Sequence, residues 1–168
     1  MATYNEWMNN NIYSAASKLS EDELHKDRGA FFKSIIGTLN HIVIGDIIWL
    51  KRFADHPGNF KSLEPIRAME KPPALNDILY HNFADLKNIR DQLDEVIINL
   101  INELDEEILN SSLLYQNTKG ITFSKKLGHL LQHFFNHQTH HRGQISTLLY
   151  QAGINIGVTD LLDCIPNT

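Results

Sequence analysis

Cysteine is nearly absent from the sequence, and so are the segments that would direct a chain out of the cell or into a bilayer. Cys164 is the single cysteine, so the chain forms no internal disulfide, as is usual in a reducing compartment. The N-terminus, MATYNEWMNN, lacks the apolar core of a signal peptide. The most apolar run, IVIGDIIWL, is interrupted by Asp46 and is far shorter than the ~20 residues of a membrane span. We therefore expect a soluble cytoplasmic protein.

An excess of positive charge is also lacking. The 15 Lys and Arg residues are outnumbered by 20 Asp and Glu, which gives a formal net charge of -5. Nucleic acids and anionic membranes attract basic surfaces, so we expect neither as a partner. The glycine motifs of nucleotide-binding loops are missing as well, which argues against a nucleotide cofactor. The 168 residues, 42% of them hydrophobic, suit a single domain over 1–168.

Helical periodicity is what the sequence has in abundance. Apolar residues recur at helical spacing in four long segments, at about 3–19, 32–53, 76–104 and 124–151. Asn76 and Ser124 are predicted to cap the last two, and Gly153 to end the fourth. Residues 112–123 contain strand-like pieces around a turn and predict a small β-hairpin. The pattern predicts an all-α four-helix bundle, in which the long ordered loop at 54–75 permits crossover connections.

The stretch HFFNHQTHHRGQI holds four histidines in nine residues. On a helix, His137 and His141 lie one turn apart, with Cβ atoms about 5–6 Å from each other. They share their face with Leu130 and Leu148, so this face is expected to look into the bundle. Two imidazoles at this spacing can converge on one ion, with metal–nitrogen bonds of about 2.0–2.1 Å. The pair alone also fits ordinary hydrogen-bonded core histidines, so a metal site needs a third ligand from another helix.

His41 is the candidate for that third ligand. It lies in the apolar segment GTLNHIVIGDIIW, with Gly37 one turn before it and Gly45 one turn after it. Glycine inside a helix costs about 1 kcal/mol relative to alanine, so the two glycines indicate either room for a ligand beside His41 or close helix–helix contact. With His137 and His141 it would give three ring nitrogens and leave a coordination position open, as in catalytic zinc sites. Neutral imidazoles suit Zn, Ni, Fe or Cu.

Other polar residues near these histidines have predicted roles. His133 lies one turn before the pair and is expected to line the cavity, to support a ligand by a hydrogen bond or to replace a ligand. Gln144 is predicted either to orient a ligand imidazole or to bond to a neighbouring helix. For His140 we expect an interhelical hydrogen bond. Arg142 points away from the ligand face, so we expect it to form a salt bridge or a dimer contact. Asp46 is predicted to pair with another helix.

These segments resemble the signature segments of the DinB/YfiT-like superfamily. LNHIVIGDIIWLKRF and FFNHQTHHRGQISTLL carry the resemblance, with YNEWMNN and LSEDELHKDRGAFFKSIIGTLNH in support, so that it runs from about Tyr4 to Leu162. It implies a four-helix bundle with two crossover connections, often forming a homodimer. It also implies a metal triad of His41, His137 and His141, with zinc or nickel as the ion. Some members resembling this chain are transferases or hydrolases that use small thiols such as bacillithiol or mycothiol.

Two functions are consistent with these residues. One is a metal-dependent hydrolase or thiol S-transferase, in which the ion activates water or a thiol. The other is a non-catalytic stress-response protein that binds a metal or a small ligand. A metal position that solvent can reach would favour the enzyme, and a fourth protein ligand would favour the binding protein. The chain lacks the H-E-x-x-H motif of zincins, and its long helices lack the Glu-x-x-His of di-iron bundles.

Overall fold

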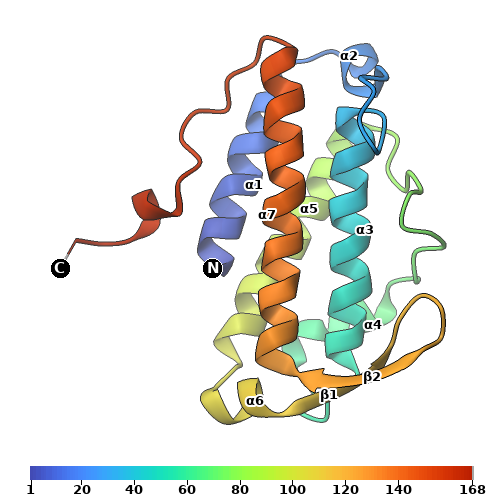
Figure 1. The fold of residues 1–168 in the computed structure, drawn as a ribbon, viewed down its shortest axis with the longest axis vertical. Coiled ribbons are helices and arrows are strands. Elements are labelled where there is room, and N and C mark those ends of the chain that lie inside the picture. The colour runs from blue at the N-terminus through green and yellow to red at the C-terminus, as the bar shows by residue number, and fades with distance from the viewer. Residues whose placement is uncertain (168) are drawn as a thin grey trace.

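The computed structural model describes residues 1–167, which form mainly helices and one antiparallel hairpin (Figure 1). The bundle consists of the four long helices α1 (Ala2–Ala16), α3 (Ile35–Ala54), α5 (Phe83–Asn102) and α7 (Leu127–Gln151). The connections and the C-terminal segment contain α2 (Glu21–His25), η1 (Lys61–Leu63), α4 (Glu64–Ala68), α6 (Glu106–Asn110), β1 (Ser112–Gln116), β2 (Thr122–Lys126) and η2 (Leu161–Cys164). The predicted all-α bundle is confirmed. None of the helices in this part of the chain is long and apolar enough to cross a bilayer.

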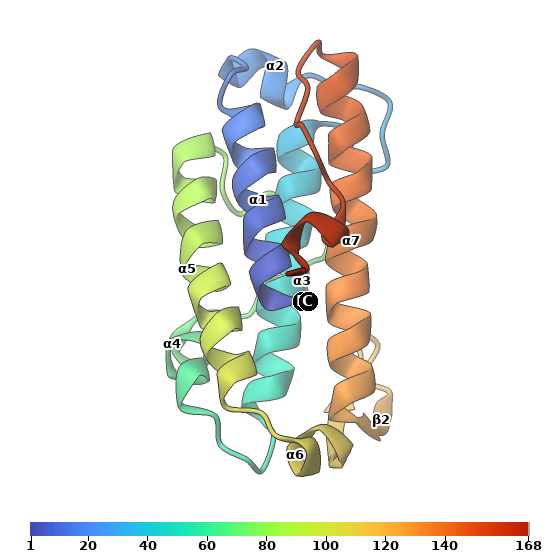
Figure 2. The same cartoon turned by 90° about the vertical axis from the view of Figure 1, so that its left-hand side faces the viewer.

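The four long helices form a ring, in which α1 contacts α5 and α7, and α3 contacts the same two helices. Helices α1 and α3 therefore lie diagonally across the bundle, and so do α5 and α7. The chain runs up in α1, down in α3 and α5, and up in α7 (Figures 1 and 2). The connections from α1 to α3 and from α5 to α7 join diagonal helices, so the bundle has crossover connections, whereas the loop at 54–75 belongs to the connection between the neighbouring helices α3 and α5. As a result, α3 and α7, which carry the candidate histidines, are antiparallel neighbours.

The beginning of α3 and the end of α7 are set by backbone conformations that few side chains adopt. Lys33 has a φ of 66°, in the left-handed region, so the chain turns here and α3 begins later than the predicted residue 32. Ser34 then caps the helix, because its Oγ accepts the N–H of Gly37 at 3.1 Å. At the same end of the bundle, Gly153 follows α7 with a φ of 82°, as predicted for its role as a helix stop.

The predicted cap at Asn76 is wrong, because a contact distant in sequence decides where α5 begins. Asn40 of α3 donates through Nδ2 to the carbonyl oxygen of Tyr80 at 2.9 Å, and its Oδ1 accepts the Tyr80 N–H at 2.9 Å. This pair of bonds holds the chain out of the helical conformation beyond Asn76. The cap is Asn82, whose Oδ1 accepts the N–H of Ala84 at 2.8 Å.

The hairpin confirms the predicted pair of strands and extends it to residue 126. Leu114 of β1 lies opposite Ser124 of β2. Ser124 is therefore a strand residue, and the prediction that it caps the last helix is wrong. The predicted loop at 54–75 contains two short helical elements that its prolines concealed, η1 and α4. Pro65 lies in the first turn of α4, where its missing N–H breaks no helical hydrogen bond.

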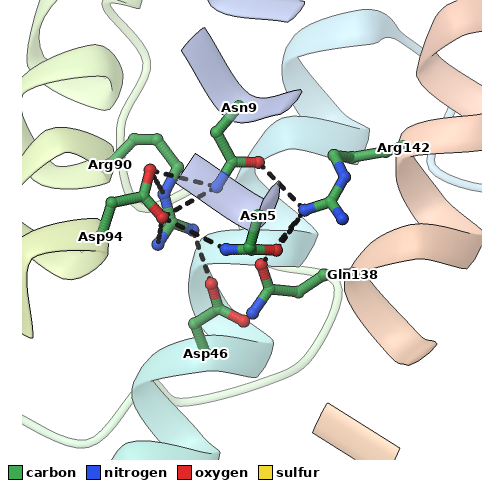
Figure 3. Close-up of polar contacts among 7 residues, drawn as sticks. All are labelled: Asn5, Asn9, Asp46, Arg90, Asp94, Gln138 and Arg142. Atoms are coloured by element: carbon green, nitrogen blue, oxygen red, sulfur yellow. Dashed lines mark hydrogen bonds and ion pairs between the residues drawn. The ribbon is translucent and has the colours of Figure 1, made fainter. Parts of the chain in front are cut away.

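A buried polar network connects all four long helices (Figure 3). Its members are Asn5 and Asn9 of α1, Asp46 of α3, Arg90 and Asp94 of α5, and Gln138 and Arg142 of α7. Arg90 Nη1 lies 2.5 Å from Asp46 Oδ2, and Arg90 Nη2 lies 3.0 Å from Asp94 Oδ1. Asp46 thus pairs with another helix, as predicted. When both carboxylates are ionised, the two arginines balance them, so the network carries no net charge.

Arg142 takes part in this network instead of the predicted salt bridge or dimer contact. It is buried, and its Nη1 donates to the side-chain oxygens of Asn5 and Asn9. No carboxylate of residues 1–167 lies within ion-pair distance of it. Burial therefore lowers the pKa of Arg142 to about 10. The prediction failed because the helical angle of Arg142 directs it to α1, which also lines the bundle interior.

Candidate metal centre

Three histidine rings meet between α3 and α7. His41 Nε2 lies 3.2 Å from His137 Nε2 and 3.1 Å from His141 Nε2. Two nitrogens bound tetrahedrally to one ion, with bonds of about 2.0–2.1 Å, lie about 3.3 Å apart. The measured separations are close to this value, and the three rings form a group that could hold one metal ion.

The second nitrogen of two of these rings shows which atoms face the centre. His41 Nδ1 lies 2.8 Å from the carbonyl oxygen of Leu75, and His141 Nδ1 lies 2.8 Å from Gln144 Oε1. Both oxygens only accept hydrogen bonds, so each Nδ1 carries the proton and donates it. The Nε2 atoms of His41 and His141 are then both acceptors, which cannot hydrogen-bond to each other. A cation between them resolves this conflict, and three imidazoles are a donor set for a transition-metal ion.

Burial keeps the three rings neutral, which is the form that binds metal. His41 is buried, while His137 and His141 are half-buried. Burial lowers the pKa of all three side chains. The pKa of His137 falls to about 3, because its burial is reinforced by the neighbouring imidazoles of His141 and His41. A proton is therefore a poor candidate for the shared cation near neutral pH.

The two glycines beside His41 differ: Gly45 permits a close contact between helices, one of the two alternatives above, whereas Gly37 contacts the preceding loop instead. A Cβ atom on Gly45 would lie 2.8 Å from His137 Cε1, so glycine makes room for that ring. A Cβ atom on Gly37 would lie 2.2 Å from the carbonyl oxygen of Phe32, so glycine makes room for the preceding loop. The Phe32 ring in turn stacks on His41, with centroids 3.9 Å apart and planes 18° apart. These contacts fix the direction of the rings.

The other predicted site residues lie around the triad, with different contacts. Gln144 bonds to His141, and its Nε2 lies 3.3 Å from His140 Nε2. His140 is exposed and contacts its own helix, so the predicted interhelical bond is wrong. His133 is exposed and lies outside the group of three, and its ring packs edge-on against Trp49, with centroids 5.0 Å apart. Among the described residues no fourth His, Cys, Asp or Glu joins the group.

Two contacts of the triad were missed by sequence reasoning. Leu75 contributes a main-chain carbonyl, and such a group leaves no signal in the residue type. Phe32 lies near His41 in the sequence, and its position before the Ser34 cap was the one available signal, since apolar residues beside a cap often pack on the helix.

Comparison with known proteins identifies the family of this chain. The sequence model of the DinB family matches residues 1–166. Protein DinB of Bacillus subtilis (strain 168) is 27% identical to this chain over 157 residues, which cover 94% of this chain and 87% of that protein. No solved structure matches the chain. The family match covers both helices that supply the three histidines and confirms the resemblance seen in the sequence: the chain belongs to the DinB family.

Proposed function

We propose that the protein is a metal-dependent enzyme that holds one divalent ion with His41, His137 and His141 and acts on water or a small thiol. The observation that carries the proposal is the approach of two acceptor nitrogens, His41 Nε2 and His141 Nε2, to 3.1 Å. Membership of the DinB family supports it. Zinc and nickel are the ions proposed, since neutral imidazoles suit both.

The residues around the triad support hydrolase or thiol S-transferase chemistry. A divalent ion supplies Lewis acidity, which lowers the pKa of a coordinated water or thiol. The three imidazoles are neutral, and no carboxylate belongs to the group among the described residues. The double charge of an ion would therefore remain uncompensated and favour an anionic partner such as a thiolate. Leu75 and Gln144 hold two rings in the required tautomer, while Phe32 shields one face of His41 from water.

A non-catalytic metal-binding protein is the alternative, and it calls for a closed coordination shell. The group of three ligand atoms in the described residues favours an open position and thus the enzyme. We further propose a cytoplasmic homodimer, as the resemblance to the family implies. Sedimentation velocity of the untagged protein tests the dimer against the monomer mass of 19.3 kDa.

Elemental analysis of untagged protein tests the metal site. We expect about one ion per chain in the wild type, and occupancy below about a tenth of this in His41→Ala and His137→Ala, because two imidazoles bind far more weakly than three. His129→Ala is the matched control, since His129 is an exposed histidine of the same helix outside the group. Circular dichroism checks that helix content is retained. Full occupancy in both triad variants would exclude the site.

Cobalt substitution separates the enzyme from the alternative. If a coordination position is open, a small thiol added to the Co²⁺-loaded protein gives a sulfur-to-metal charge-transfer band. A loaded protein that stays spectroscopically unchanged at saturating thiol, and hydrolyses no test ester or amide, would support the non-catalytic reading.

A further inference from the structure

A cavity of about 640 Å³ lies apart from the triad. It is open to solvent on one side and is lined by the last turns of α3, the α4 region and the hairpin, and none of the three histidines lines it. Its volume falls within the range of about 300–1,000 Å³ typical of small-molecule sites. Arg52, which lines the cavity, follows His41 by 11 residues in α3, or about 16 Å along the helix axis. Ile48, the lining residue of α3 that is closest to His41 in the sequence, follows it by seven residues, or about 10 Å, so the cavity and the metal centre are separate places on the same helix.

The wall of this cavity is basic, although the chain as a whole is acidic. Lys51, Arg52, Arg67 and Lys71 line it, and Asp55 is the one carboxylate among the lining residues. The whole chain has a formal net charge of -5. A basic cavity is therefore a local feature and not a consequence of overall composition.

Two of the four cations are engaged by the fold. Lys51 Nζ donates to the carbonyl oxygen of Ile66 at 2.9 Å. Arg67 donates to the carbonyl oxygens of Phe60 at 3.2 Å and Ala54 at 3.1 Å. These bonds connect the α4 region to the end of α3, and this structural role is enough to explain why Lys51 and Arg67 lie at the cavity wall.

Arg52 packs against two aromatic rings, and no polar partner for it is found in residues 1–167. Its Cζ lies 4.5 Å from the centroid of the Trp49 ring and 5.2 Å from that of Tyr115. None of its side-chain N–H groups bonds to an acceptor in residues 1–167, and no carboxylate pairs with it there. Stacking on aromatic faces fixes the plane of a guanidinium and leaves its N–H edges free. Burial lowers the pKa of Arg52, so this charge is partly desolvated without a protein anion to compensate it.

Complementing the helix dipole does not account for these cations. Basic residues in the last turn of α3 are favourable for that reason, and Arg52 is one of them. Lys71 lies well beyond the helix and yet lines the same cavity. The dipole would also be complemented by an Arg52 side chain that points into solvent, instead of one stacked on rings at the cavity wall.

We propose that this cavity is a second ligand site, which binds a small polar molecule through a doubly charged oxyanion group, a phosphate or paired carboxylates, with Arg52 as its anchor. A planar guanidinium binds such groups through two parallel N–H···O bonds. Lys71 supplies the second positive charge. On the hairpin side, Gln116, Asn117 and Thr118 line the cavity with amides and a hydroxyl, which suit a hydroxylated body.

Titration with two simple oxyanions tests the proposal. Inorganic phosphate and citrate are added to the wild type and the variants at low ionic strength, and the amide resonances are followed by NMR. We expect saturable shifts at Arg52, Lys71 and the hairpin, and a dissociation constant raised about tenfold or more in Arg52→Gln, the loss of one charge-assisted pair. Lys71→Gln is expected to weaken binding as well. The ratio of the two affinities assigns the group to phosphate or to carboxylate.

Two controls separate this site from the metal centre and from general surface charge. Lys125→Gln removes a cation that lies 5.8 Å from the Phe123 ring of the same hairpin, outside the cavity. His41→Ala disables the triad and leaves the cavity intact. Both should bind the probes as the wild type does. Binding that survives in Arg52→Gln and Lys71→Gln, binding that disappears in His41→Ala, or no saturable shift with either probe would overturn the proposal.

Discussion

At Gly45 the absence of a side chain allows the His137 ring to approach α3. A methyl group there would lie 2.8 Å from His137 Cε1, closer than such contacts occur. We predict that Gly45→Ala displaces the ring and weakens metal binding about tenfold or more, although alanine is the better helix former by about 1 kcal/mol. Competition with a chromophoric chelator measures the metal affinity.

Gly143→Ala provides the control for this prediction. Gly143 lies in α7, and a Cβ atom on it would meet nothing within 4 Å. Its replacement should leave metal affinity unchanged and raise the free energy of unfolding by up to about 1 kcal/mol. If Gly45→Ala also keeps wild-type affinity, the ring does not depend on the glycine.

The three histidines could be predicted as a group because residue type and helical spacing carry their signal. His133 shares that signal, and the structure nevertheless places it outside the group. The reason is the register of two antiparallel helices: moving from His141 to His133 along α7 means moving from His41 to Trp49 along α3. Trp49 occupies the level of His133 and packs against its ring. This register is a relation between two helices, so it cannot be predicted from the spacing of residues in α7 alone.

At the scale of elements, the pattern of residues predicted the four long helices and the hairpin, but it did not predict all of their ends. Gly153 acts locally and was predicted, whereas Ser34 also acts locally but was not recognised, and the start of α3 was predicted at about residue 32. The start of α5 depends on Asn40, which is distant in sequence, and so Asn76 looked as good a cap as Asn82. A local bond leaves a signal near the end of the element, whereas a bond to a distant residue leaves none.

Helix α5 contains two ion pairs with the same spacing, of which one is buried and the other is exposed. Arg90 pairs with Asp94 in the interior, and Lys87 pairs with Asp91 at the surface, both four residues apart. We predict that Arg90→Met lowers the free energy of unfolding by about 3–5 kcal/mol, because it leaves the carboxylates of Asp46 and Asp94 buried without a cation. Urea unfolding followed by circular dichroism measures the change.

Lys87→Met is the matched control on the same helix. An exposed pair contributes about 0–1 kcal/mol, so this variant should unfold within that margin of the wild type. Equal destabilisation by the two substitutions would mean that burial of the network has little energetic weight.

For the whole molecule, the buried network links stability to pH through Asp46. Burial raises the pKa of Asp46 to about 6, although Arg90 pairs with it and opposes the shift. Burial also raises the pKa of Asp94. In the unfolded chain an aspartate has a pKa of about 3.9. Between these values the folded protein holds more protons than the unfolded chain, so the Asp46 contribution to stability falls as pH rises from about 4 to about 6.

Asp46→Asn isolates this contribution, because asparagine cannot ionise. The free energy of unfolding of the wild type minus that of Asp46→Asn should therefore fall between pH 4 and pH 7, by on the order of 2–3 kcal/mol. Histidines with lowered pKa values, such as His137, act in the opposite direction, since their contribution is lost as pH falls. They are common to both proteins and cancel in the difference. Urea unfolding of both proteins across this range gives the slope, and a difference that is flat or that rises with pH would show that Asp46 is ionised throughout, with Arg90 dominating its burial.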